Sequence, residues 1–475
     1  MYLFTRAQLR QFRAVVRRSK IGRSAKFNPQ LIIAAFGDRY ALQAIYETVA
    51  IELSVTATCA RDRFVLPLEV LQACEGNSND HVAIRQTGND RISVEWIDQR
   101  IPQVREYDRL PADDTPPFPA LPDEVSTNSH SFWSALREAI GSAEKVRTRY
   151  ALDCLQLRGQ VGQIVATDGQ QALVQAGFTF PWTEDVLIPA LNVLGCPELT
   201  EDQQPISIGR TADLVTLVLG AWTVAIKIEK DAHYPKVQST IPTTASTRSR
   251  LNLSPEDAQF LMATLPKLPS EDQFHWPVTV ELNGHVAVRG KSVGGSPATE
   301  LVLSHSRLYG EPVRWQTNRK LLARAIGMGF RDVCLTDSES PALCDDGQRQ
   351  FVWALLNPKD AISAQTDAIR IESASKSETA PVPGSKTVRS HHRRMALPVT
   401  AEEADSDQSS PAEPSGPETL ALSTLIEDVE VLQTNLRDAM AKTAALVTGL
   451  KRQKGYAQLM RASVQSLQAL HVTPS

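Results

Sequence analysis

A repeated segment constrains the fold of this 475-residue chain more than any other feature. Residues 64 to 74 read FVLPLEVLQAC, and residues 186 to 196 read VLIPALNVLGC. A constant shift of 122 positions (196 − 74) places Pro67 on Pro189 and aligns the two final cysteines. Other features recur in the same order at nearly the same interval, so we interpret the chain as tandem copies of one unit.

Each copy combines helix-type and strand-type patterns, which predicts an α+β unit. The segments 5 to 20 and 131 to 148 carry apolar residues at helical spacing and open the first two copies. In the repeated segment, Pro67 stands where a helix start tolerates its missing N–H. Gly-Asp at 37–38 and Asp-Gly at 168–169 separate apolar runs and predict β-hairpins.

A third and looser copy fits residues 251 to 358. The segment SPEDAQFLMATL predicts a helix with Ser254 as its N-cap and Pro255 at its first position. Asn-Gly at 283–284 predicts another hairpin. TNRKLLARAIGMG predicts a second helix, capped by Thr317.

The chain continues well past the third copy. Residues 359 to 418 lose apolar content, which is typical of a disordered linker. Its basic cluster KTVRSHHRRM fits a solvated charge run and a loose phosphate-binding patch equally well. Residues 419 to 471 follow a three-four apolar spacing, broken only at Thr443 and Gln453, which predicts a coiled-coil helix. Self-association of this helix is favoured, with the sister subunit or another partner as alternatives.

A chain of this length is too long for one core, so we divide it into consecutive parts. The predicted parts are three α+β units with two helices and two β-sheets each at 1–126, 127–243 and 250–358, a disordered linker at 359–418 and a coiled-coil helix at 419–471.

Composition excludes some classes of protein. The six cysteines are scattered, with no CxxC pair and no nearby histidines, which argues against a zinc site or a disulfide framework. No apolar run approaches the roughly 18 residues of a membrane span. We therefore expect an intracellular protein with core thiols and no cofactor. The net charge of −4 is uninformative by itself, because the position of the basic residues decides nucleic-acid binding.

The first helical segment concentrates positive charge. Residues 5 to 20 contain six basic residues and no acid. At 100° per residue, four of its five arginines, those at 6, 10, 13 and 17, fall within about 60° of one another, apart from the apolar stripe. Surface helices usually mix both signs of charge, so an acid-free arginine stripe favours contact with phosphates over a merely solvated face.

The order of these segments resembles the bacterial sliding clamp, the β subunit of DNA polymerase III. The resemblance covers residues 1 to 358 and is most specific in YALDCLQLRGQVGQIVATDG, LIPALNVL, HYPKVQSTIP and GEPVRWQTNRKLLARAIGMGFRDVCLTDSESPALC. It implies three DNA-clamp domains and a head-to-tail homodimeric ring around double-stranded DNA. It also implies a cytoplasmic, nucleoid-associated processivity factor in DNA replication rather than an enzyme, with DNA polymerase and clamp-loader subunits as partners.

Two sets of residues follow from this resemblance. Positive helices of the ring would contact phosphates without reading sequence. The candidates for this DNA-binding lining are Arg6, Arg10, Arg13, Arg17, Arg149, Arg319, Lys320 and Arg324. The family also has a pocket for short apolar peptides of its partners. Its walls here would be Leu152, Thr167, Gly169, Gln170, Gln171, Ala172, Pro242, Leu355, Asn357 and Pro358.

The chain departs from the family at this pocket. Gln170-Gln171-Ala172 stands where the family usually has His-Arg-Leu, which removes a cation and a large apolar wall. LLNP at 355–358 replaces a Met-Pro-Met type ending, and 117 residues (475 − 358) follow it. The peptide preference of the pocket therefore stays open.

Two further functions compete with the sliding clamp. A clamp-derived scaffold or regulator would keep the fold, act through the coiled coil and not support replication itself. An enzyme is disfavoured, because the sequence has no Walker loop, no GxSxG and no HExxH.

Overall fold

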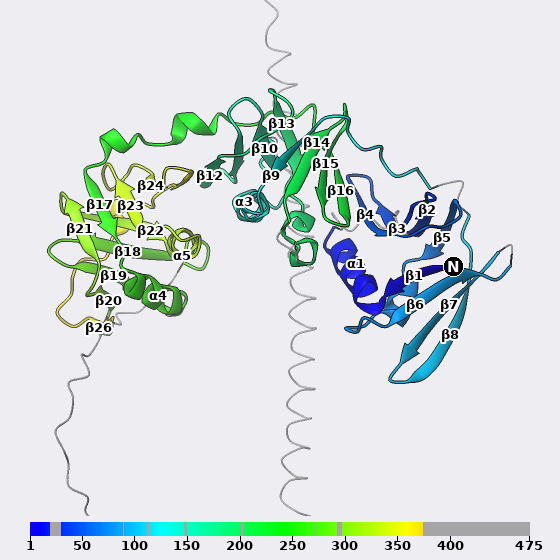
Figure 1. Ribbon diagram of the computed structural model, residues 1–475. Helices are drawn as coiled ribbons and strands as arrows, with labels where there is room; N and C mark the ends of the chain where they lie inside the picture. The colour runs from blue at the N-terminus through cyan, green and yellow to red at the C-terminus, as the bar shows by residue number, and fades with distance from the viewer. Residues whose placement is uncertain are drawn as a thin grey trace, which may run out of the picture. The chain divides into compact units, whose positions relative to one another are not determined.

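The structure, a computed structural model, describes residues 1–19, 30–88, 90–111, 115–146, 150–200, 204–270, 272–291 and 297–373. The predicted coiled coil, the basic cluster and the predicted linker after residue 373 lie outside these residues. The described part is a sheet-rich mixed fold with few helices, in agreement with the predicted α+β class (Figure 1).

The strands form four sheets in the described part. The first has the order β1 (Tyr2–Thr5), β6 (His81–Gln86), β7 (Arg91–Asp98), β8 (Ile101–Asp108). The second has the order β5 (Asp62–Pro67), β2 (Gln30–Ala35), β3 (Arg39–Ile45), β4 (Val49–Thr56), β16 (Trp222–Lys227), β15 (Leu214–Leu219), β14 (Ile206–Arg210), β9 (Val125–Asn128).

The other two sheets hold the later strands. The third sheet has the order β13 (Asp185–Pro189), β10 (Cys154–Arg158), β11 (Gln163–Thr167), β12 (Gln171–Ala176), β25 (Arg349–Trp353), β24 (Ala342–Asp345), β23 (Asp332–Leu335), β17 (Ser249–Asn252), β21 (Arg307–Gly310). The fourth has the order β22 (Val313–Asn318), β18 (Pro277–Leu282), β19 (Val286–Gly290), β20 (Thr299–Leu303), β26 (Ile369–Glu372).

These sheets are built largely from three-stranded meanders. The meanders β2-β3-β4 and β14-β15-β16 join through β4 and β16, where Val49 lies opposite Ile226. The meanders β10-β11-β12 and β23-β24-β25 join through β12 and β25, where Gln171 lies opposite Trp353. In both joins the third strand of one meander pairs antiparallel with the third strand of the other. The meanders β6-β7-β8 and β18-β19-β20 belong to the two sheets without such a join.

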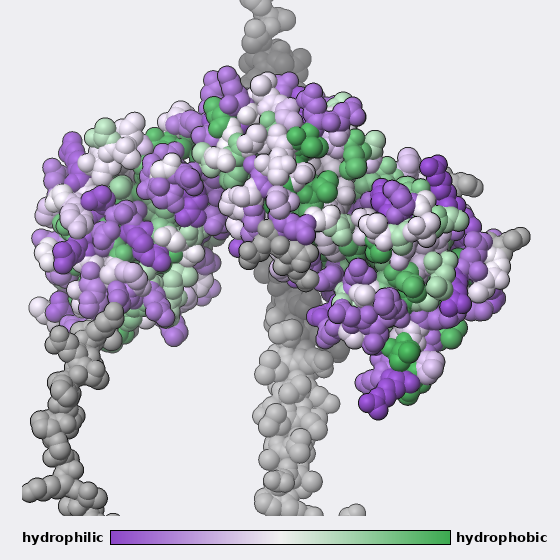
Figure 2. All heavy atoms as spheres, viewed as in Figure 1, coloured by the Kyte–Doolittle hydropathy of each residue, from purple (hydrophilic) through white to green (hydrophobic). Residues whose placement is uncertain are grey.

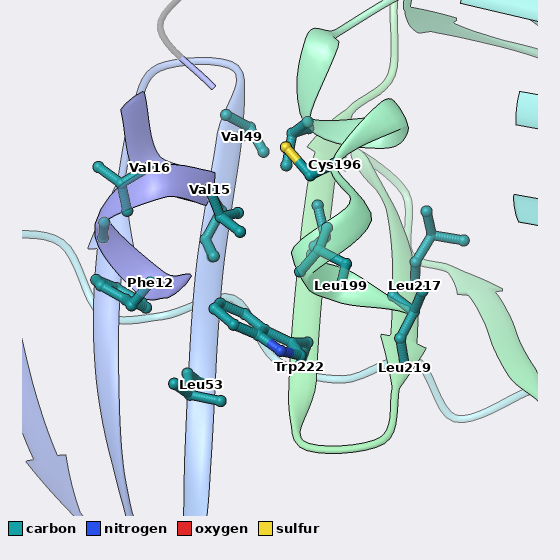
Figure 3. Packing of buried hydrophobic residues seen from close by; sticks show 14 of the residues in the cluster. Phe12, Val15, Val16, Val49, Leu53, Cys196, Leu199, Leu217, Leu219 and Trp222 are labelled. Atoms are coloured by element: carbon teal, nitrogen blue, oxygen red, sulfur yellow. The ribbon is translucent and has the colours of Figure 1, made fainter. Parts of the chain in front are cut away.

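The α-helices contribute buried apolar residues to the core. The described α-helices are α1 (Arg6–Arg18), α2 (Val70–Cys74), α3 (Ser131–Ile140), α4 (Pro255–Thr264) and α5 (Arg319–Gly327). Figure 3 shows Phe12 and Val15 of α1 beside Leu53 of β4 and Trp222 of β16, so α1 packs over the join of these two strands. One buried cluster includes residues from Tyr2 to Ile226, and a second includes residues from Leu173 to Trp353.

Several predicted local structures are confirmed. Hairpins form at each predicted turn, and Gly37, Gly169 and Gly284 have φ angles of +108°, +90° and +75°. Glycine occupies this left-handed region without steric cost. Ser254 caps α4 as predicted, because its hydroxyl accepts a hydrogen bond from Asp257 N at 3.1 Å. The predicted cap of α5 is wrong by one residue, since Asn318 caps it.

The repeat forms different elements from those we predicted. Pro67 and Pro189 are the last residues of β5 and β13 rather than helix starts. Both strands lie at sheet edges, where the missing N–H of proline breaks no ladder. The helix α2 follows in the first copy, but only the 3₁₀ turn η1 (Asn192–Gly195) follows in the second. The described residues of the second copy therefore hold one α-helix, α3, which ends at Ile140 rather than near 148.

Residues 359–373, where we expected the linker to begin, contain two regular elements. The 3₁₀ turn η6 (Pro358–Asp360) is followed by β26, which adds to β20 as a parallel edge strand. All four residues of β26 are exposed. Because a short exposed strand carries no buried apolar pattern, the sequence did not distinguish this segment from a linker.

The cysteines are free thiols. Cys74, Cys154, Cys196 and Cys344 are buried, as predicted for core residues. Burial raises the pKa of Cys74 to about 12. Within the described residues, no three potential ligands gather into a metal site. None of the helices in that part is both long and apolar enough to span a bilayer.

Candidate nucleic-acid interface and partner pocket

The helix α1 presents the arginines that the sequence singled out. A capping box starts it: Gln8 N donates to Thr5 Oγ1 at 3.1 Å, and Thr5 N donates to Gln8 Oε1 at 2.9 Å. Leu9, Phe12, Val15 and Val16 form its buried face. The predicted separation of an apolar stripe from the basic residues is therefore confirmed.

Two of these arginines are engaged inside the protein. Arg6 donates to the carbonyl oxygens of Cys74 at 3.2 Å and Glu75 at 3.1 Å, and pairs with Asp98 at 2.9 Å. Its side chain is only 14% exposed. Arg13 pairs with the Glu75 carboxylate at 2.5 Å. Arg6 thus satisfies carbonyls at the end of α2, and its prediction as a phosphate ligand is not supported by this geometry.

Arg10 and Arg17 lie on the surface of α1. Arg10 donates to the neutral Asn77 Oδ1, which leaves its charge uncompensated. Arg17 makes no ion pair with any residue that the structure describes. Arg18, which we did not single out, pairs with Glu198. Because Arg17 and Arg18 occupy the last turn, they also offset the negative end of the helix dipole.

The basic residues at the start of α5 surround Trp276. Arg319 is 4% exposed, donates to Leu268 O and lies over the Trp276 ring, 4.5 Å from its centroid. Burial lowers the pKa of Arg319. Lys320 Nζ lies 4.7 Å from the same centroid but remains exposed. The guanidinium of Arg319 is therefore engaged in the core beneath α5, and its contact with DNA stays a prediction.

Arg324 connects α5 to the end of α3. Its Nη2 donates to Glu138 O at 2.6 Å and to Ser142 Oγ at 3.0 Å. Burial lowers the pKa of Arg324. A Cβ at Gly141 would clash with the guanidinium, so the glycine makes room for it. Arg324 is thus engaged in a contact between α5 and the end of α3, and its place in the DNA-binding lining stays a prediction.

The eight predicted DNA-binding residues thus separate into groups. Arg149 lies outside the described residues. Arg6, Arg319 and Arg324 are engaged by the protein itself, and Arg13 has a carboxylate partner. Arg10, Arg17 and Lys320 remain as exposed cations without a carboxylate partner in the described part. Helical periodicity located the basic face, but it could not reveal which guanidiniums meet internal acceptors.

The hairpin β11–β12 organises the predicted partner pocket. The Asp168 carboxylate accepts hydrogen bonds from Gln170 N at 2.8 Å, Gln171 N at 2.9 Å and Gln171 Nε2 at 2.7 Å. Thr167 Oγ1 accepts from Gly169 N at 3.0 Å and donates to Gln171 O at 2.6 Å. Asp168 was missing from the predicted set. Its position before glycine is the sequence signal of such an Asx turn.

The hairpin residues differ in their availability to a ligand. Thr167, Gln171 and Ala172 are 5%, 8% and 4% exposed, so they support the wall rather than form its surface. Gly169 and Gln170 are exposed. Among the ten predicted residues, those two and half-buried Leu152 supply the accessible hairpin side, and Leu152 Cδ1 approaches the position of a Gly169 Cβ within 3.9 Å.

The end of the third copy approaches this hairpin. Ala354 N donates to Gln170 O at 2.8 Å, which brings the following residue, Leu355, near the turn. Asn357 is exposed, caps η6 by accepting from Lys359 N at 3.1 Å, and lines a cavity with His275 and Gln316. The structure thus joins the hairpin to the start of the 355–358 segment but gives Asn357 a second, local role.

The remaining predicted residues lie beside the same strands. Ile241, next to Pro242, packs against a cluster that contains Ala172 and Val352. Pro242 and Pro358 are half-buried. Residues from three distant segments therefore meet around β12, and the peptide pocket itself stays a prediction.

Comparison with known proteins identifies the fold. No family model matches the chain, and no curated protein matches it. Among solved structures, a DnaN sliding clamp (DNA polymerase III subunit beta) from Pseudomonas aeruginosa bound to griselimycin is 17% identical, with a TM-score of 0.63. That match covers 75% of this chain and 99% of the clamp chain. The DNA polymerase III beta subunit of Thermotoga maritima is 16% identical, with a TM-score of 0.60 over 75% of this chain and 98% of that chain. At these identities the likeness establishes a sliding-clamp fold.

Proposed function

We propose that this protein is a DNA sliding clamp, a processivity factor that encircles duplex DNA and tethers replication proteins. The observation that carries the proposal is the fold likeness, which extends over nearly the whole length of a clamp subunit. In this proposal the three clamp domains are residues 1–126, 127–243 and 250–358. No catalytic step is involved, because such a ring retains DNA by topology.

The internal joins support a specific way to close the ring. In both existing joins, third strands of meanders pair, and the third strands left without such a partner are β8 and β20. We propose that β8 of one subunit pairs antiparallel with β20 of a second copy. Repeating this head-to-tail contact twice closes a homodimer.

The existing joins also supply the register. The first residue of β4, Val49, lies opposite the fifth residue of β16, and the first residue of β12 likewise lies opposite the fifth of β25. The same rule places Ile101 opposite Leu303 of the second copy, and Arg105 opposite Thr299.

Two independent features agree with this register. Gln103 of β8 lies opposite buried Trp96 of β7, so it is on the core side of its sheet. In the proposed register Gln103 lies opposite Leu301 of β20, which is also on the core side of its sheet. The pairing of β7 with β8 directs the N–H of Val104 away from β7. The carbonyls of Ala298 and Val302 point away from β19, and by the alternation of a strand the backbone groups of Glu300 between them do so as well. Val104 and Glu300 therefore face each other with their free hydrogen-bonding groups in the proposed register. A shift by one residue would destroy both matches.

The surface of β8 also suits such a contact. Ile101 and Val104 of β8 are 61% and 64% exposed, and Ile97 of the adjacent strand β7 is 52% exposed. Figure 2 shows hydrophobic spheres on the hairpin that Figure 1 labels β7 and β8. An unpaired eight-residue edge with exposed apolar side chains is a surface that proteins usually cover.

Within the ring, DNA contact would be electrostatic and independent of sequence. Arg10, Arg17 and Lys320 are the described cations that we propose for it. DNA polymerase and clamp-loader subunits would bind through short peptides at the β11–β12 hairpin, beside Leu152, Gln170 and Leu355.

A cross-linking experiment tests the ring. Arg105 and Thr299 would form a non-hydrogen-bonded pair, whose Cα separation of about 4.5 Å is compatible with a disulfide. Oxidation of Arg105→Cys/Thr299→Cys in the presence of nicked circular duplex should give a complex that survives high salt and is released when the DNA is linearised. Each single variant is the control. Equal loss from circular and linear DNA would contradict encirclement.

The second candidate function is a clamp-derived scaffold or regulator acting through the C-terminal region. It is favoured by the internal engagement of Arg6, Arg319 and Arg324, which leaves few described cations for DNA. Replacing the ordinary clamp of the host with this protein separates the two functions. Processive synthesis supports the sliding clamp, and its absence with a closed ring supports the scaffold.

A further inference from the structure

The strand edge that the proposed ring needs is already occupied within the chain. β26 pairs in parallel with β20, with Ile369 opposite Thr299 and Glu372 opposite Val302. Ile369 N donates to Ala298 O at 2.8 Å, and Ser373 N donates to Val302 O at 3.0 Å. These are outward carbonyls of β20, so β8 of a second copy and β26 cannot pair with this edge together.

The strand β26 has few means of attachment. It is four residues long, all four residues are exposed, and Ile369 and Ile371 remain 55% and 43% exposed. It buries little apolar surface, and parallel pairing is slightly less stable per residue than antiparallel pairing. β8 would pair antiparallel and, in the proposed register, would lie opposite all five residues of β20 through Ile101–Arg105, whereas β26 pairs over four. Exchange of one strand for the other is therefore physically accessible.

One ion-pair network holds β26 in place. Arg370 Nε donates to Glu300 Oε1 at 2.6 Å, and the Glu300 side chain is only 1% exposed. The other Glu300 oxygen accepts from Arg289 Nε at 2.5 Å, and Arg289 also pairs with Glu281 at 2.5 Å. Arg289 is thus shared between two carboxylates. Arg370 supplies Glu300 with a second cation, and this cation is lost when β26 separates from β20.

We propose that residues 369–373 act as an intramolecular plug that competes with β8 of a second copy for the edge of β20. The inference rests on the proposed ring and adds its regulation. With β26 docked, the edge is closed to a second subunit. With β26 released, the edge is open and the ring can join. The chain continues directly from the plug beyond residue 373. A partner that binds this continuing segment would therefore act on the pairing of β26 with β20, and through it on the join between β8 and β20.

A reversible lock tests the plug in the full chain. Val302 and Glu372 are opposite each other, so Val302→Cys/Glu372→Cys should form a disulfide that fastens β26 to β20. We expect the oxidised protein to be monomeric in analytical ultracentrifugation, and the same protein after reduction to form dimers. Single-cysteine variants, treated identically, control for the native thiols. Equal dimerisation in the oxidised and reduced states would overturn the plug.

A release variant provides the opposite change. Ile369→Pro removes the N–H that bonds to Ala298, whereas Glu372→Pro removes an N–H that points away from β20 and serves as the matched control. Loss of about one backbone hydrogen bond and the local pairing should strengthen dimerisation by about tenfold for Ile369→Pro only. Equal effects of both prolines contradict the plug.

Failure of the plug and failure of the ring remain distinguishable. If the Arg105→Cys/Thr299→Cys variant forms cross-linked dimers, but oxidation of Val302→Cys/Glu372→Cys does not reduce dimerisation, the proposed ring is supported and the plug is wrong. If neither the reduced lock nor the release variant dimerises, the β8–β20 join itself is wrong, and the plug with it.

Discussion

The ring of Phe12 on α1 is stacked on the ring of Trp222 on β16, with centroids 6.0 Å apart and planes inclined by 9°. Trp222 also lies opposite Leu53 of β4 in the shared sheet. One tryptophan therefore couples the basic helix to the join between two meanders. Arg10 and Arg17 lie on the exposed side of the same helix.

Truncation of this tryptophan should destabilise the fold strongly. Trp222 is 6% exposed, so Trp222→Ala leaves a cavity and should lower the free energy of unfolding by about 3–5 kcal/mol. Trp222→Phe should cost much less, because a ring remains against Phe12. Urea denaturation of both variants measures the difference, and equal losses would contradict the role of ring packing.

Gly141 and Arg324 should behave as one unit. Gly141→Ala places a methyl group where the Arg324 guanidinium lies, so the hydrogen bonds to Glu138 O and Ser142 Oγ are lost. We expect about 1–3 kcal/mol lost for Gly141→Ala and for Arg324→Met, and little further loss in the double variant. Additive losses in chemical denaturation would refute the coupling.

Arg10 and Arg17 should contribute to DNA binding without sequence preference. Each contact with a phosphate adds about 0.9 to the slope of log K against log salt concentration. Arg10→Ala and Arg17→Ala should each lower that slope by about this amount in duplex anisotropy titrations. Arg91→Ala, on β7 and paired with Glu106, is the matched control and should leave the slope unchanged.

Arg6 should behave differently from its neighbours on α1. Its guanidinium bonds to Cys74 O, Glu75 O and the Asp98 carboxylate, so Arg6→Ala leaves buried carbonyls without donors. We expect a loss of about 1–3 kcal/mol in the free energy of unfolding. A variant with wild-type stability but a reduced salt slope would restore Arg6 to the DNA-binding set.

Acid should release β26. Burial by itself raises the pKa of Glu300, but its hydrogen bonds with Arg370 and Arg289 outweigh burial and place the pKa below the usual 4.5. A lowered carboxyl pKa stabilises the fold at pH values above 4.5, and this contribution is lost as the pH falls through the folded-state pKa. The protection of the β26 amides from hydrogen exchange, taken relative to the intrinsic exchange rate at each pH, should therefore fall below pH 4.5, and Glu300→Gln should remove this dependence.

The sequence by itself determined the features that depend on neighbouring residues. Asp168-Gly169 and Asn283-Gly284 turn the chain because glycine takes a positive φ, and Ser254 caps α4 through a bond to Asp257, three residues on. The apolar stripe of α1 and the tandem repeat were also readable, because periodicity and self-similarity need no knowledge of distant partners.

Only the tertiary structure decided which predicted residues are available for function. Arg324 meets an acceptor on Glu138, and Arg370 meets Glu300; both partners are distant in sequence. Pro67 ends a strand because β2 pairs with it, and Ile369 joins a sheet because β20 has an open edge. Amphipathic spacing reports that a side chain lies on a face, whereas burial and ion pairing depend on what the rest of the fold places against that face.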